Sequence, residues 1–136
     1  MGTNYDWRSN PCPTCGHSEE VKHIGKSSAG WCFALHVYPA EGINDLADWI
    51  TRWNAGAIYD EYDRKISRDD MISTITARSV PDRGQETLAW YRENHAQPGP
   101  NGLARHKVER ERALGYGSGC IGHGDGTWDL IIGEFS

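Results

Sequence analysis

Two stretches near the amino terminus carry apolar and β-branched residues bounded by small turn-forming residues, a pattern typical of β-strands. They are VKHIG at 21–25 and GWCFALHVY at 30–38, and the residues at 27–30 are Ser, Ser, Ala and Gly. Serine and glycine are common in turns. The pattern therefore predicts a β-hairpin that turns at 27–30.

The predicted hairpin determines which side chains share a face. A turn at that position places His23 opposite Ala34. Cys32 and His36 then lie diagonally from His23 on the same face, because diagonal cross-strand neighbours remain within reach of long side chains. We therefore expect the His23 and His36 side chains to lie close together.

Beyond residue 43 the apolar period changes to that of an amphipathic helix. Apolar residues recur at i, i+3, i+4 and i+7, at Leu46, Trp49, Ile50 and Trp53. Residues 45–54 are therefore predicted to form a helix with Asn44 as its N-cap.

Two more helices and a second hairpin are predicted in the middle of the chain. Residues 57–67, AIYDEYDRKIS, favour a short strand pair. Ser67 is a typical N-cap, and the helix after it would bury the stripe Met71, Ile72 and Ile75. Pro81 is a suitable first residue for a third helix that reaches about His95, before QPGPNG at 97–102 breaks it.

The cysteines predict a structural zinc site. Cys12 and Cys15 are separated by two residues and followed by glycine, which is the spacing of a zinc knuckle. Cys120 and His123 repeat the spacing, and glycine again follows. Together they predict a Cys3His site for structural Zn2+ that joins the two ends of the chain and closes a long loop.

A local zinc site is the alternative. In the predicted hairpin register, His23 and His36 share a face close to the first knuckle. These two histidines are therefore alternative third and fourth ligands beside Cys12 and Cys15.

These elements predict an α+β fold: a small zinc-ribbon-like β-hairpin or sheet with two or three short helices. The chain has 136 residues, which suits one domain with one core. We expect a single zinc-stabilised domain over 1–136. It would comprise the knuckle and hairpin in 1–40, a helical segment with a short hairpin in 43–95, and C-terminal strands that close the metal site in 103–136.

The formal charge of −5 opposes non-specific binding to nucleic acid, because phosphate contacts need clustered cations. The exception is ARHKVERER at 104–112, where interleaved glutamates dilute the basic field. Its possible nucleic-acid contacts are Arg105, Lys107, Arg110 and Arg112. The chain shows no apolar leader and no membrane-length apolar run, so we expect a cytoplasmic protein.

The Gly25-Lys26-Ser27 triplet does not predict a phosphate loop. The Walker A pattern requires a glycine where this chain has Glu20, and it requires a following helix where this chain has a predicted strand.

A metal-dependent hydrolase is an alternative that the motifs do not favour. It would use His123, Asp125 and Asp129, or a zinc-bound water activated by His17 or Glu134. The chain has no H-E-x-x-H pattern and no Ser or Cys nucleophile beside a recognisable base. The sequence leaves the question of enzymatic activity open and favours a protein that is not an enzyme, and no residue is assigned a catalytic role.

The most distinctive segments are CPTCG, HIGKSSAGWCFALHVYP, IYDEYDRKIS and GTWDLIIGEFS. In these segments the chain resembles small uncharacterised zinc-knuckle proteins of tailed bacteriophages. The resemblance implies a phage-type accessory protein in the host bacterial cytoplasm. We therefore expect a zinc-stabilised module that binds a host or defence protein, with a nucleic-acid-binding zinc protein as the alternative.

Overall fold

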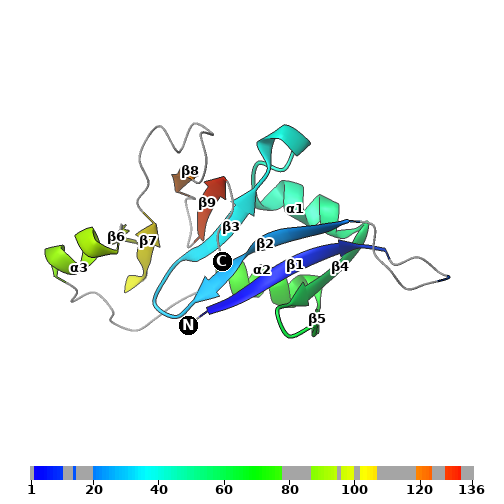
Figure 1. Cartoon of the computed structure of the whole chain (residues 1–136), viewed down its shortest axis with the longest axis horizontal. Helices are drawn as coiled ribbons and strands as arrows, with labels where there is room; N and C mark the ends of the chain where they lie inside the picture. The colour runs from blue at the N-terminus through cyan, green and yellow to red at the C-terminus, as the bar shows by residue number, and fades with distance from the viewer. Residues whose placement is uncertain are drawn as a thin grey trace.

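The computed structural model describes residues 2–10, 14, 20–77, 87–94, 96–99, 102–106 and 128–132, together with the backbone of residues 119–123. These residues form a seven-stranded sheet, a separate two-stranded sheet and three short α-helices (Figure 1). The predicted α+β class is therefore confirmed. The zinc-ribbon character stays a prediction.

The large sheet has the strand order β5-β4-β1-β2-β3-β9-β8. All neighbouring strands are antiparallel except β3 and β9, which are parallel. The strands are β1 Gly2–Ser9, β2 Val21–Ser28, β3 Phe33–Val37, β4 Gly56–Asp60, β5 Lys65–Ile66, β8 Gly119–His123 and β9 Trp128–Ile132. The sheet thus combines strands from both ends of the chain.

The helices α1 (Leu46–Trp53) and α2 (Arg68–Thr76) cover one face of this sheet, behind β1 and β2 in the view of Figure 1. Their buried side chains join those of the strands in one core. Its members are Trp7, Ile24, Phe33, Leu35, Ile43, Trp49, Trp53, Ile58, Met71 and Ile75. Burial of such large apolar side chains is the main favourable contribution to folding.

Helix α1 follows the predicted amphipathic pattern, but its N-cap is Asp45 and not Asn44. The Asp45 carboxylate accepts a hydrogen bond from the Asp48 backbone N–H. The Asp48 side chain in turn accepts one from the Asn44 backbone N–H. This reciprocal arrangement explains the shift by one residue, because both carboxylates satisfy orphan backbone donors at the start of the helix.

The other two helices also follow their caps. Ser67 caps α2 as predicted, and its hydroxyl accepts from the Asp70 N–H. Helix α3 spans Leu88–Glu93 and is shorter than predicted, because Thr87 caps its start. The predicted start of that helix, Pro81, lies outside the described residues.

The strand pair β4–β5 confirms the predicted second hairpin. Asp60 holds its turn together: the carboxylate accepts hydrogen bonds from the backbone N–H groups of Tyr62 and Arg64 and an ion-paired bond from the Arg64 side chain. These bonds require a buried carboxylate at position 60. Asp63 adopts the left-handed conformation that the turn needs, with φ of 62°.

The first hairpin forms with a register that differs from the prediction. Ala34 pairs with Lys26, and not with His23. The reason is that β2 continues to Ser28 and β3 begins only at Phe33, so the connection is longer than the composition indicates.

A β-bulge interrupts β2 where it pairs with β1. Tyr5 pairs with Gly25, but the next residue, Asp6, pairs with His23, so Ile24 has no opposite residue on β1. Ile24 and Gly25 are consequently both buried, and His23 turns to the face away from α1 and α2. A strand without this extra residue would direct His23 to the helical face.

The small sheet pairs β6 (Ala96–Pro98) with β7 (Ala104–His106). Backbone hydrogen bonds attach β7 to the segment before β3: Cys32 donates to the Ala104 carbonyl, and Ala104 donates to the Gly30 carbonyl. Helix α3 lies beside β6 at this end of the molecule (Figure 1). None of the helices in the described ranges is long and apolar enough to cross a membrane.

Truncation of Ile75 tests the packing of α2 against the sheet. Ile75 is fully buried in the core, so Ile75→Ala should lower the free energy of unfolding by about 2–5 kcal/mol. Ile72 is only partly buried on the same helix, so the matched control Ile72→Ala should cost clearly less. Urea unfolding monitored by circular dichroism measures both. Equal losses would contradict this orientation of α2.

Candidate functional site

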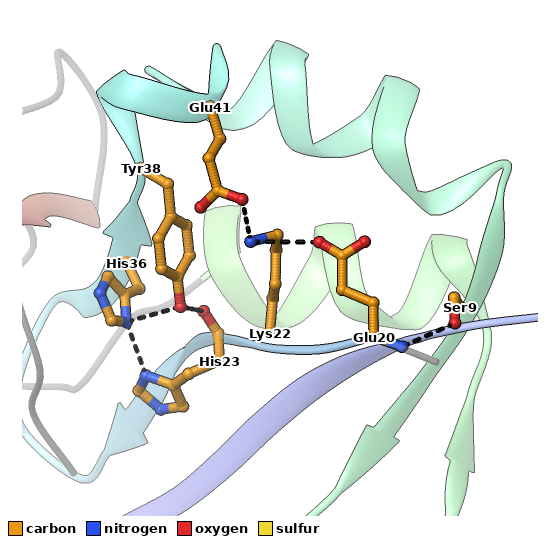
Figure 2. Close-up of polar contacts among 7 residues, drawn as sticks. All are labelled: Ser9, Glu20, Lys22, His23, His36, Tyr38 and Glu41. Carbon is orange, nitrogen blue, oxygen red and sulfur yellow. Dashed lines mark hydrogen bonds and ion pairs between the residues drawn. The ribbon is translucent and has the colours of Figure 1, made fainter. Parts of the chain in front are cut away.

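Two histidines meet at the junction of β2 and β3. The Nδ1 atoms of His23 and His36 are 3.0 Å apart, and the rings meet edge to face (Figure 2). His36 is buried and His23 is half-buried. The structure therefore brings together the two residues that the sequence analysis names as alternative zinc ligands, and their role as ligands stays a prediction.

The surrounding hydrogen bonds assign the protons of this pair. His23 Nε2 lies 2.9 Å from the Asn4 side-chain oxygen, so it carries the proton and donates. In a neutral ring His23 Nδ1 is then an acceptor, and His36 Nδ1 must donate to it. The Tyr38 hydroxyl donates its proton to the His23 backbone carbonyl at 3.0 Å. The Tyr38 hydroxyl oxygen lies 3.2 Å from His36 Nδ1 and can accept from it. The proton on His36 Nδ1 thus forms the hydrogen bond between two neutral imidazole rings.

This position depends on the shape of β2 and β3. The two strands pair only at Gly25–Leu35 and Lys26–Ala34. At His23, beyond these two pairs, the backbone carbonyl accepts its hydrogen bond from the Tyr38 hydroxyl. The Tyr38 ring also stacks on His36, with centroids 4.3 Å apart.

Two further contacts hold the backbone and the ring in place. The Trp49 indole N–H donates to the His36 carbonyl, which anchors the strand backbone to α1. Lys22 lies over the Tyr38 ring and forms ion pairs with Glu20 and Glu41 (Figure 2). The pair is therefore held by several elements at once.

The environment keeps both imidazoles neutral. Burial lowers the pKa of His36 to about 4, and the nearby His23 and Lys22 act in the same direction. Burial also lowers the pKa of His23, against an opposing attraction from Asp6. Burial raises the pKa of Asp6, which His23 and Arg8 partly offset. At neutral pH the site thus contains two uncharged imidazole rings beside a carboxyl group.

A second polar cluster surrounds Asp129 on β9. Its carboxylate is fully buried and accepts hydrogen bonds from Arg105 Nε at 2.9 Å, from the His106 backbone N–H at 2.8 Å and from His106 Nδ1 at 2.9 Å. These bonds fasten β7 to the large sheet and compensate the buried charge. Asp129, a candidate of the hydrolase alternative, is thus occupied in a structural ion pair, and Arg105 is largely neutralised.

Aromatic side chains gather beside this cluster. The Trp31 ring lies 5.0 Å from the His106 ring and 5.7 Å from the Trp90 ring, and Trp90 contacts Tyr91 edge to face at 5.1 Å. We name these four residues, Trp31, Trp90, Tyr91 and His106, the aromatic cluster. All four are partly exposed, and Leu88 at the start of α3 is 83% exposed.

The predicted zinc knuckles are only partly covered by the described residues. Cys12 and Cys15 lie outside them, and for Cys120 and His123 only the backbone of β8 is described. Strands β3 and β9 separate β8 from β2, which corresponds to about 14 Å between β8 and β2. The Cys3His site therefore stays a prediction.

The remaining candidate residues also fall mostly outside the described ranges. Of the possible nucleic-acid contacts, Lys107, Arg110 and Arg112 lie outside them, as do His17, Asp125 and Glu134 of the hydrolase alternative. Within the parts of the chain that the structure describes, no three His, Cys, Asp or Glu side chains group in a way that could hold a metal ion.

Sequence analysis missed the connection between Asp129, Arg105 and His106 and the aromatic cluster beside it. The residues come from four separate parts of the chain, so no local spacing indicates their contact. The one available signal was an Asp within the apolar strand TWDLII, which requires a buried partner.

Comparison with protein-family models, with curated proteins and with solved structures finds no match for this chain. The function is therefore inferred from the geometry of the molecule.

Removal of the Asp129 charge should destabilise the protein strongly. Asp129→Asn leaves Arg105 without its buried counterion, and we expect a loss of about 3 kcal/mol or more in the free energy of unfolding. The matched control is Asp63→Asn, which removes the exposed partner of Arg8 and should cost about 1 kcal/mol or less. Chemical denaturation measures both variants, and comparable losses would show that the Asp129 pair is not buried in solution.

Acidification should destabilise the metal-free protein through His36. Its folded-state pKa of about 4 lies below the ordinary value of 6.5, so the unfolded chain binds more protons between these values. Stability is therefore complete above pH 6.5 and falls as the pH drops towards 4, by about 3 kcal/mol for this group. The lowered pKa of His23 also makes the protein less stable as the pH falls. The other ionisable groups that face the pair are Asp6, Lys22 and Tyr38.

Unfolding titrations at a series of pH values measure this effect. His36→Gln removes the titrating group and should flatten the pH dependence between 6.5 and 4. An unchanged slope in His36→Gln would contradict the assignment to His36.

Proposed function

We propose that this protein is a zinc-stabilised protein-binding module that docks its partner through the aromatic cluster. The observation that supports the proposal is the group of partly exposed tryptophan, tyrosine and histidine rings in the aromatic cluster, together with the exposed Leu88 at the start of the helix that carries Trp90 and Tyr91. Tryptophan and tyrosine are the residues that contribute most to protein interfaces, because they bury large areas and keep a polar group at the rim.

The cluster is held on rigid supports. His106 is fixed by Asp129, and the backbone at Trp31 and Cys32 is hydrogen-bonded or bridged to β7. A preorganised surface loses less side-chain freedom on binding, so more of the contact energy appears as affinity.

A basic protein surface is the partner chemistry that fits this cluster. The chain carries a formal charge of −5, and aromatic faces attract Arg and Lys side chains. The protein uses the same contact internally, where Arg8 lies over Tyr59, Arg52 over Trp7 and Arg64 over Tyr62. The partner would therefore place an Arg or Lys against Trp31 or Trp90. From the phage resemblance, we propose a host or defence protein in the bacterial cytoplasm.

Zinc is proposed as the stabilising cofactor. Cys12 and Cys15 would supply two ligands, completed either by Cys120 and His123 or by a local pair of histidines. A structural zinc ion contributes folding free energy directly, because the unfolded chain does not offer a preformed site.

Single-stranded nucleic acid is the second candidate, because the aromatic cluster adjoins the basic segment that begins at Arg105. Exposed rings would stack on bases. The ion pair with Asp129 removes Arg105 from the cations available for phosphate contacts, which favours the protein partner.

Truncation of Trp90 tests the docking surface. Trp90→Ala should weaken capture of the partner by about 30-fold, since interface tryptophans commonly contribute 2 kcal/mol or more. Tyr62→Ala is the control, because Tyr62 is an exposed aromatic side chain on the distant β4–β5 turn and should leave capture unchanged. The measurement is affinity capture from lysate of infected bacteria, carried out with and without nuclease treatment. Mass spectrometry and titration of the recovered protein with each variant follow.

Three outcomes would contradict the proposal. They are equal capture by wild type and Trp90→Ala, a loss with Tyr62→Ala as well, and recovery of nucleic acid alone. In the last case, Trp fluorescence titration with a single-stranded oligonucleotide at several salt concentrations would test the second candidate.

A further inference from the structure

We propose that His23 and His36 bind one divalent transition-metal ion through their Nδ1 atoms, and that the ion takes the place of the proton that joins the two rings. The inference gives the location of the metal in the proposed function. It rests on the zinc-binding part of that function and is independent of the docking surface.

The distance between the two nitrogens fits a shared ion. Zinc binds imidazole nitrogen at about 2.0–2.1 Å. Two nitrogens that are 3.0 Å apart can therefore contact one ion at an angle of about 90° at the metal. Rotation of both rings by part of a rotamer well would widen this angle towards the tetrahedral value.

The protons of the pair suit this exchange. His23 Nδ1 already presents a lone pair, because its proton is on Nε2. His36 Nδ1 carries the proton that the metal would displace. When that proton leaves Nδ1, a proton is taken up at Nε2, so His36 changes tautomer and remains a neutral ligand. Both rings are neutral at physiological pH, which is the protonation state that metal ligation requires.

The outer contacts of the pair resemble those of ligating histidines. A metal-bound histidine commonly donates its other ring N–H to an oxygen, which determines the tautomer and ring orientation. Asn4 provides that oxygen for His23, and its position on β1 is set by pairing with β2. The Trp49 bond to the His36 carbonyl fixes the backbone of the second ligand.

Oxygen-bearing side chains neighbour the pair, but within the described residues no third His, Cys, Asp or Glu groups with it as a metal ligand, so water would supply the remaining positions that no cysteine occupies. Asp6 is the cross-strand partner of His23 and interacts with it electrostatically. The Tyr38 hydroxyl oxygen lies 3.2 Å from His36 Nδ1. Imidazole with carboxylate or water suits Zn2+, Ni2+, Cu2+ or Co2+, whereas Mg2+ and Ca2+ prefer oxygen alone. We therefore assign the site to the first group of metals.

Zinc titration of isotope-labelled full-length protein tests the assignment. Long-range 1H–15N correlation spectra report each imidazole nitrogen separately. We expect Zn2+ to shift the Nδ1 resonances of His23 and His36 and to leave those of His106 unchanged, because His106 Nδ1 is bonded to Asp129. Unchanged Nδ1 resonances of His23 and His36 at saturating Zn2+ would overturn the proposal.

Affinity measurements on variants provide the second test. A chelator competition assay should show at least about 100-fold weaker Zn2+ binding in His36→Gln, since even outer contacts of a ligand contribute 10–100-fold. Asn4→Ala removes only the outer contact of His23 and should weaken binding about tenfold. Tyr62→Ala is the control on the exposed β4–β5 turn, outside the pair and the aromatic cluster, and it should bind Zn2+ like the wild type. Melting curves without metal show whether each variant is folded.

The cysteines give a further distinction. Cobalt substitution produces a thiolate charge-transfer band only when cysteine ligates the metal. Loss of metal binding in His36→Gln supports the proposal, whether or not the cobalt-substituted wild type shows this band. The presence of the band in the wild type shows whether Cys12 and Cys15 complete the site. Undiminished binding in His36→Gln together with loss of binding in Cys12→Ser would overturn it in favour of the two-knuckle site. Neither result changes the expected behaviour of Trp90→Ala in partner capture.

Discussion

Complete burial of strand β3 is the constraint on which the rest of the structure depends. All five of its residues are buried, with Phe33 and Leu35 in the core and Ala34 and His36 on the opposite face. A strand that is covered on both faces has no room for an unsatisfied polar group. His36 therefore requires partners within the protein, and His23, Tyr38 and the Trp49 indole contact its ring or its backbone.

The same burial explains why two polar clusters lie on the face away from α1 and α2. Register places Asp129 beside Ala34 on that face, and Ile131 beside His36. Asp129 forms an ion pair with Arg105 and a hydrogen bond with His106. His36, by contrast, stays neutral because burial disfavours the charged form. The cluster at Asp129 thus holds β7 through an ion pair, and the cluster at His23 and His36 contains two neutral imidazole rings.

The two clusters support different parts of the proposed function. The hydrogen bonds of Asp129 attach the small sheet to the large one and fix the position of His106 in the aromatic cluster. The histidine pair lies between β2 and β3, which pair at only two positions, and the proposed metal ion would reinforce this pairing. The proposed docking surface and the proposed metal site would therefore be physically separate.

The sequence by itself determined the elements whose signals are local. The helical period at residues 46–53, the cap at Ser67 and the hairpin at 56–66 depend on neighbours within a few residues, so their patterns predict them well. Tertiary structure alone decided the rest. The bulge at Ile24 directs His23 towards His36 because two consecutive residues, Ile24 and Gly25, are both buried in the core. Asp129 contacts Arg105 because β7 packs on β9. Such contacts minimise the free energy of the whole buried interior, and no short segment of the chain contains that information.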